Sequence, residues 1–261
     1  RPFQDELIKD VCLALSERKH LVCHAPTGLG KTVSALAPAI SFALKENKSV
    51  FFLSPKTSQH ELAVEVVKGL SKKFGLNLRG IDLVGKRYMC SDPMVSSTGF
   101  DGFYEVCSKK VKHEQCVYYG NAVGFSKEEK SVSQLYLDVL SKASLPVLNN
   151  YDFKNMAVSM TGRNGERPMC AYEASMQIRK ESNVVICDYF HVLNPGVSKI
   201  TLNRLNKKLS DSILIVDEAH NLPDRLRKLM SSTLSSLSIT QAAKEAKILN
   251  DDILYDKLIF L

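Results

Sequence analysis

The sequence predicts an α/β protein with a parallel sheet, and three observations support this. Short apolar runs of strand length alternate with segments of helical periodicity, a glycine-rich loop opens one of the helices, and a pair of acidic residues ends a later run. Strands separated by helices form right-handed parallel crossovers, which leave the carboxyl ends of the strands, where ligands bind, at one edge of the sheet. At 261 residues the chain is long enough for one large or two ordinary domains.

The first elements follow from the spacing of the apolar residues. Helices are expected over 5–16, 32–45 and 60–74, and strands over 21–23, 49–53 and 76–84. Pro38 falls inside the second helix and is expected to kink or weaken it.

The segment His20–Thr32 reads HLVCHAPTGLGKT, the pattern of a strand, a tight loop and the start of a helix. Backbone N–H groups of such a loop, together with the helix macrodipole, form a hollow that suits a polyphosphate. We expect Lys31 to lie over the β- and γ-phosphates of a nucleotide, and the Thr32 hydroxyl to bind the Mg²⁺ that bridges them. An ordinary glycine-rich turn would not explain a lysine in the first helical turn, where the dipole disfavours a cation unless an anion is bound. The residues assigned to the nucleotide are Ala25, where the strict pattern has Gly, and Pro26, Thr27, Gly28, Leu29, Gly30, Lys31 and Thr32.

From residue 85 to about residue 172 the alternation of strand and helix breaks, and long apolar periods are few apart from 132–140. This block is interpreted as an insertion that something other than a large core holds together. It contains four cysteines outside apolar runs, Cys90, Cys107, Cys116 and Cys170, whereas Cys12, Cys23 and Cys187 lie in apolar runs and are expected in the core. The close Cys-x₂₋₄-Cys pair of most zinc sites is absent, and scattered thiolates can hold a cubane cluster. Spacing alone leaves a cluster, a zinc site and unliganded thiols open.

The alternation returns with strands over 183–187 and 212–216. The second is expected to be buried and runs into Asp217-Glu218-Ala219-His220. Adjacent acids alone are usually a solvated turn, but at the end of a strand that faces a phosphate loop they fit nucleotide hydrolysis. Asp217 is expected to hold Mg²⁺ through its water shell and Glu218 to orient or deprotonate the attacking water. After Pro223 the pattern is helical only.

Basic residues outnumber acidic ones by 35 to 28, which permits an anionic partner such as nucleic acid without requiring one. Basic side chains crowd the first three cysteines of the block, with Tyr88, Phe103 and Tyr104 between them. Cations track phosphates while aromatic rings stack on bases, so this region is a candidate surface for a single strand; a solvated basic face is the alternative. The basic residues are Lys86, Arg87, Lys109, Lys110 and Lys112. No apolar run approaches the ~20 residues of a membrane span and no signal peptide opens the chain, so an intracellular protein without disulfides is expected.

The motifs APTGLGKT and DEAH together resemble the first motor domain of superfamily 2 helicases. The chain resembles the XPD family of iron–sulfur helicases over nearly its whole length. The resemblance rests on the cysteine block between these motifs, with CAYE beginning at Cys170, on DYFHVLNP after a strand, and on VDEAHNLP. The resemblance implies a RecA-like motor domain that a four-iron, four-sulfur domain interrupts, followed by the start of a helical arch domain. The expected divisions are 1–84 and 176–228 for the motor, 85–175 for the cluster domain and 229–261 for the arch.

The resemblance also implies roles for individual residues. The ligands of the cluster would be Cys90, Cys107, Cys116 and Cys170. Gln4 would bind the adenine base. The segment Ser54–Thr57 would contact DNA, through Lys56 and Thr57 in particular. His220 would link the nucleotide site to the other motor and to DNA. Ala171 departs from the family, in which a proline is common.

The implied activity is that of an ATP-dependent 5′ to 3′ DNA helicase of nucleotide excision repair that uses ATP, Mg²⁺ and the cluster. The implied partners are single-stranded DNA, duplex junctions, repair-complex proteins and a second motor domain not contained in these residues, and the implied location is the nucleoid or the nucleus. A DinG-like or FANCJ-like helicase and a nucleotide-gated DNA clamp or scaffold are the alternatives. The apolar segment 253–261 ends without a cap, so a longer chain is expected.

Overall fold

The computed structural model describes residues 3–26, 28–125, 147–159, 168–178 and 182–260. The chain divides into two compact units, Arg1–Leu222 and Pro223–Leu261. The apolar stretch 132–140 lies outside the described residues.

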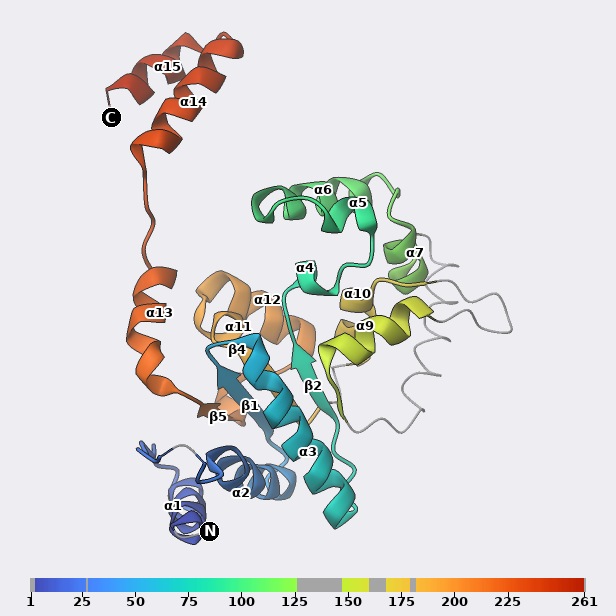
Figure 1. Cartoon of the computed structure of the whole chain (residues 1–261), viewed down its shortest axis with the longest axis vertical. Coiled ribbons are helices and arrows are strands. Elements are labelled where there is room, and N and C mark those ends of the chain that lie inside the picture. The colour runs from blue at the N-terminus through green and yellow to red at the C-terminus, as the bar shows by residue number, and fades with distance from the viewer. Residues whose placement is uncertain (1–2, 27, 126–146, 160–167, 179–181, 261) are drawn as a thin grey trace. The chain divides into compact units, whose positions relative to one another are not determined.

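The first unit is built on a parallel sheet, which confirms the predicted α/β class (Figure 1). In the described residues the strand order is β3-β2-β4-β1-β5. Their bounds are β1 Ser49–Ser54, β2 Gly80–Leu83, β3 Val147–Leu148, β4 Val184–Asp188 and β5 Ser212–Val216. Ser54 pairs with Asp188 on one side of β1, and Leu53 pairs with Val216 on the other. The ends of β4, β1 and β5 therefore lie next to one another.

Helices cover both faces of the sheet, because successive side chains of a strand point to opposite faces. Val50 and Phe52 pack with the helices α2 and α3, whereas Phe51 and Leu53 pack with residues of α10, α11 and α12. A further helix, α1, packs against α2. The bounds of these helices are α1 Gln4–Ser16, α2 Lys31–Lys45, α3 His60–Phe74, α10 Ala171–Ile178, α11 Phe190–Leu193 and α12 Pro195–Leu205. Pro38 lies inside α2, which continues through it.

Between β2 and β4, the regular elements in the described parts of the cysteine block are helices, apart from the two-residue strand β3 (Figure 1). Besides α10 its described helices are α4 Lys86–Met89, α5 Pro93–Ser96, α6 Phe100–Lys112, α7 Val117–Val123 and α9 Asn150–Ser159. One apolar cluster includes Met89, Phe153 and Met169, and a smaller one includes Val95 and Phe103. The block therefore has more apolar core than its sequence predicts, because the residues that form it are far apart along the chain.

Short 3₁₀ helices and three further helices complete the described chain. The 3₁₀ segments are η1 Thr57–Gln59, η3 Leu209–Asp211 and η4 Ala219–Asn221, and the helices are α13 Leu222–Leu229, α14 Ser236–Ile248 and α15 Asp252–Ile259. In the second unit α14 and α15 contact each other. Among the described helices, none combines the length and the apolar character that crossing a membrane requires.

Two predicted features of the sheet are wrong. Leu21–Cys23 forms no strand and all three residues are exposed, because a run of three apolar residues makes few pairings of its own. The strand β5 is not buried: it is the edge of the described sheet, and Leu214 on it is 42% exposed. Cys12 and Cys23 are likewise exposed rather than in the core, while Cys187 is buried on β4.

Candidate functional site

The glycine-rich loop has the backbone conformation that its glycines allow. Gly28 and Gly30 have φ of 82° and 92°, in the left-handed region that side chains disfavour. A Cβ atom on Gly30 would lie 3.0 Å from Nε2 of Gln4, so the Gln4 amide lies against this loop. Pro26, Leu29 and Thr32 are described and Thr27 is not.

Lys31 begins α2, directly after the loop. Its Nζ donates a hydrogen bond to the carbonyl oxygen of Ala25 at 3.1 Å, so the side chain folds back over the loop. Burial and the neighbouring Glu218 carboxylate raise the pKa of Asp217, while the charge of Lys31 acts in the opposite direction. The structure therefore brings the loop lysine and the acidic strand end within electrostatic reach of each other.

The turn after β5 holds Glu218 in a left-handed conformation, with φ of 50° and ψ of 43°. The backbone N–H of Asp217 donates to Leu53 O at 2.8 Å, which continues the pairing with β1. The Tyr189 hydroxyl donates to the carbonyl oxygen of Asp217 and lies 3.1 Å from that of Glu218. His220 Nδ1 is 3.3 Å from Glu218 Oε2. The sequence analysis missed Tyr189, although its place directly after a buried strand could have indicated it.

The segment Ser54–Thr57 leaves the carboxyl end of β1, next to that turn. The Ser54 hydroxyl is buried and donates to the carbonyl oxygen of Lys56 at 3.0 Å, which fixes the start of the loop. Lys56 and Thr57 are exposed.

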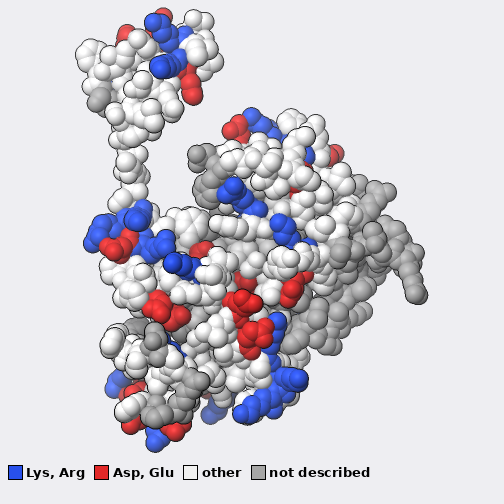
Figure 2. All heavy atoms as spheres, in the orientation of Figure 1, with Lys and Arg blue, Asp and Glu red and all other residues white. Residues whose placement is uncertain are grey.

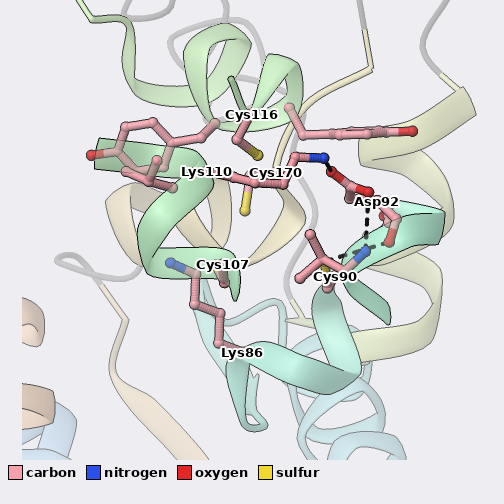
Figure 3. A pocket seen from close by; sticks show the side chains of 12 residues that line it. Lys86, Cys90, Asp92, Cys107, Lys110, Cys116 and Cys170 are labelled. Carbon is pink, nitrogen blue, oxygen red and sulfur yellow. Dashed lines mark hydrogen bonds and ion pairs between the residues drawn. The ribbon is translucent and has the colours of Figure 1, made fainter. Parts of the chain in front are cut away.

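The four cysteines of the block line one pocket (Figure 3). They come from separate places: Cys90 ends α4, Cys107 lies in α6, Cys116 precedes α7 and Cys170 precedes α10. The backbone N–H of Cys170 donates to Tyr118 O at 2.8 Å, which joins the last cysteine to α7. No group of three His, Cys, Asp or Glu side chains in the described chain is placed to bind a single metal ion.

Two lysines, Lys86 and Lys110, also line this pocket (Figure 3). Each pairs with a carboxylate. Lys110 Nζ lies 2.6 Å from Asp92 Oδ2, and Lys86 Nζ lies 3.2 Å from Glu173 Oε1. Burial acts to lower the pKa of Lys86, but Glu173 and the nearby thiols of Cys107 and Cys170 outweigh it and raise the pKa. Both lysines are therefore half-buried and ion-paired, and their assignment to a DNA-binding surface stays a prediction.

Asp92 and Glu173, the partners of these lysines, were missed by the sequence analysis. Asp92 caps α5, accepting from the N–H groups of Met94 and Val95 at 3.0 and 3.2 Å. The Asp-Pro pair at 92–93 is a sequence signal for such a helix start. Glu173 is 6% exposed and also pairs with Arg204 of α12. No local pattern predicts that pairing, because 31 residues separate the two.

Burial acts on three thiols of this pocket and raises their pKa, which favours the neutral form of each. Burial raises the pKa of Cys90 and Cys116, and raises that of Cys170 to about 12. Thiolates are the form that binds iron, so a cationic ligand would have to stabilise their charge there.

The remaining basic and aromatic residues of the region differ in exposure. Phe103 is fully buried in the smaller apolar cluster, whereas Tyr88 and Tyr104 are exposed. Lys109 is exposed and pairs with Glu105, and Lys112 is exposed. Arg87 is partly buried. Figure 2 shows basic and acidic side chains interspersed over the described residues of this face.

The fold and these motifs define a class, that of α/β proteins with a phosphate-binding loop and an acidic strand end on a parallel sheet. The family model DEAD_2 matches residues 52–239, so the chain belongs to the DEAD_2 family. The DEAD/DEAH box helicase model matches residues 1–91.

Among curated proteins, the chain is similar to the "General transcription and DNA repair factor IIH helicase subunit XPD/RAD3" of Saccharomyces cerevisiae. The two are 22% identical over 97% of this chain and 32% of that protein. It is also 25% identical to the "Regulator of telomere elongation helicase 1 homolog" of Anopheles gambiae, over 81% of this chain and 20% of that protein. The chain thus spans a third or less of these relatives.

Solved structures share the fold. The chain superposes on one described as "XPD_Helicase" with a TM-score of 0.65 at 20% identity, over 99% of this chain and 39% of that one. A second, described as "Truncated XPD", gives a TM-score of 0.56 at 18% identity, over 97% of this chain and 64% of that one.

Proposed function

We propose that this chain is the nucleotide-binding and cluster-binding part of an ATP-dependent DNA helicase of the XPD type. The observation that carries the proposal is the pocket lined by four cysteines, placed in one compact unit with the phosphate loop and the acidic end of β5. Either feature alone occurs in many proteins, whereas this combination on a DEAD_2 chain is specific to an iron–sulfur motor.

The nucleotide site would hydrolyse ATP with the residues that the fold brings together. Lys31 would bind the β- and γ-phosphates, Thr32 and Asp217 would hold Mg²⁺, and Gln4 would read the adenine edge. Glu218 would take a proton from the water that attacks the γ-phosphorus, while the bond from that phosphorus to the bridging oxygen breaks and ADP leaves. His220, 3.3 Å from Glu218, would pass the state of the site to a second motor domain.

The cysteine pocket fits a four-iron, four-sulfur cluster. The four thiols line one space, and four thiolates from scattered positions can hold a cubane cluster. Cys90, Cys107, Cys116 and Cys170 would be its ligands. Its iron–sulfur bonds would cross-link four helical segments, and Lys86 and Lys110 would offset the negative charge of the thiolates.

Single-stranded DNA would run along basic and aromatic side chains of the first unit. We propose contacts from Lys56, Thr57, Arg87, Lys109 and Lys112, with Tyr88 and Tyr104 stacking on bases. Residues 1–84 and 176–228 would form the motor domain, 85–175 the cluster domain and 229–261 the start of the arch. The finer proposals are 5′ to 3′ movement, duplex junctions as substrates, repair-complex proteins as partners, and action in nucleotide excision repair in the nucleoid or nucleus.

The test uses the full-length protein prepared without oxygen. We expect four irons and four acid-labile sulfides per chain, ATP hydrolysis that single-stranded DNA stimulates, and unwinding of duplexes with a 5′ overhang but not a 3′ overhang. Glu218→Gln should keep ATP binding and lose hydrolysis, because an amide cannot accept the proton of the water. Stoichiometric zinc without iron would contradict the cluster, and DNA-stimulated hydrolysis without unwinding would favour a nucleotide-gated clamp.

A further inference from the structure

Tyr189 contacts two loops that come from different strands. It directly follows β4, and it is 3% exposed, with its ring in the apolar cluster on the α12 face of the sheet. Its backbone N–H donates to the carbonyl oxygen of Ser54 at 3.3 Å. Its hydroxyl donates to the carbonyl oxygen of Asp217 and lies 3.1 Å from that of Glu218. Because β1 lies between β4 and β5, Tyr189 reaches across the end of β1 to make these contacts.

Each loop that Tyr189 contacts has one of the proposed functions. Ser54 begins the segment proposed to contact DNA, and the turn at 217–218 carries the carboxylates proposed to hold Mg²⁺ and activate water. A phenol has a single hydrogen, so the Tyr189 hydroxyl divides its donation between the two carbonyl oxygens of the turn. That of Glu218 also accepts from the backbone N–H and the side-chain amide of Asn221, at 2.9 and 3.1 Å. These donors help to hold Glu218 in a conformation that residues other than glycine rarely adopt.

We propose that Tyr189 is a positioning residue that couples DNA binding at Ser54–Thr57 to ATP hydrolysis at Glu218. This inference rests on the proposed function and deepens it. The φ and ψ of Glu218 set the direction in which its side chain leaves the end of the strand, so the Tyr189 hydroxyl, together with Asn221, helps to set where the carboxylate meets the attacking water. A shift of Ser54 on DNA binding would reach the same turn through the Tyr189 backbone and ring.

The variant Tyr189→Phe isolates this role, because it keeps the ring in the core and removes only the hydroxyl. In the full-length protein we expect the DNA-stimulated kcat for ATP to fall about tenfold, the effect of losing one hydrogen bond that positions a reacting group. The KM for ATP and the affinity for single-stranded DNA should stay within about twofold of the wild-type values, and the thermal midpoint should be unchanged within error. No contact to phosphate, to DNA or within the apolar core is lost. Tyr255→Phe removes a hydroxyl in the second unit and should leave all of these unchanged.

A double variant tests whether Tyr189 acts through Glu218. In a Glu218→Asp background, which keeps a carboxylate and a reduced but measurable rate, Tyr189→Phe should cause much less than a further tenfold loss of hydrolysis, because the two residues serve one function. A wild-type DNA-stimulated rate in Tyr189→Phe would overturn the inference and leave the proposed function intact. Loss of the rate with a matching loss of thermal stability would also overturn it, since the hydroxyl would then be structural. A wild-type protein without DNA-stimulated hydrolysis would overturn the proposed function itself, and the inference with it.

Discussion

Glu173 joins the wall of the cysteine pocket to a helix that covers the sheet, and its replacement by Gln should loosen that junction. Its carboxylate pairs with Lys86 of the pocket and with Arg204 of α12, and its side chain is only 8% exposed. The rings of Tyr119 and Tyr172 lie beside Lys86, and Tyr172 also lies beneath Arg204. Glu173→Gln keeps the shape of the side chain and leaves two cations facing a neutral amide.

The expected magnitude follows from the exposure of the three groups. Breaking a buried ion pair usually costs about 3–5 kcal/mol. The side chains of Lys86 and Arg204 are 23% and 36% exposed, so both cations can regain water, which reduces the cost to about 2 kcal/mol. If the free energy of local opening of α10 falls by this amount, the amides of that helix should exchange about 30-fold faster.

The assay is amide hydrogen exchange of the complete protein, read at the peptides that cover α10 and α4. Exchange is preferred to global unfolding here, because it reports the local opening of α10 separately from the rest of the chain. The control is Glu105→Gln, which removes an equivalent but exposed pair with Lys109 and should leave α10 unchanged. Unchanged exchange in α10 of Glu173→Gln would refute the argument that this carboxylate holds the block on the sheet.

Four further predictions follow from the sites described above. Lys31→Ala should abolish ATP hydrolysis in the full-length protein without altering its circular dichroism spectrum, because the ammonium offsets phosphate charge; turnover at the wild-type rate would remove Lys31 from the site. Replacing any one of the four pocket cysteines by serine should abolish iron binding and expose residues 85–172 to proteolysis, whereas Cys12→Ser should keep the iron. Full iron content after each single replacement would show that these cysteines are not the ligands. Burial acts to raise the pKa of Asp188, but the hydrogen bond and charge of His191 and the charge of His60 lower it, so its stabilising effect is complete above about pH 4 and is lost as the pH falls further. Thermal midpoints of wild type and Asp188→Asn should therefore converge in acid, and a constant difference down to pH 2 would contradict this. Residues 1–261 alone should bind Mg·ATP weakly and should not unwind a duplex. Related NTPases gain ~10³ to 10⁵ in rate from an arginine finger, and in this protein that arginine is expected from the second motor domain. Strand separation by residues 1–261 alone would show that their motor is complete.

The sequence predicts the elements whose apolar pattern is long and regular. The helices around Leu36 and Val64 and the strands β1 and β4 were expected, because their buried faces repeat with the correct period. The two-residue strand β3 is too short to have a period, and it was missed. The exposure of β5 was mispredicted because burial of a strand depends on what pairs with its edge.

The sequence predicts which residues form the sites more fully than it predicts the side chains that surround them. The cysteines of the pocket could be selected because they lie outside apolar runs, and the structure places them around one space. The ion pair of Lys86 was not predicted, because its partner Glu173 lies 87 positions away, beyond the reach of any local pattern. The place of Tyr189 directly after a buried strand could have indicated a site residue, but its partner could not be predicted, since its hydroxyl bonds to a turn 28 residues further on.

The cysteine block leaves the sheet twice. The chain departs after β2, returns to add β3 beside it, and departs again before β4. Cys90, Cys107 and Cys116 belong to the first departure and Cys170 to the second. A ribosome making this chain would therefore expose an incomplete, three-thiol site for 53 residues before the fourth ligand is made. Delivery of iron and sulfide to the nascent protein would have to await Cys170, and the three earlier thiols would be the ones most open to oxidation in the interval.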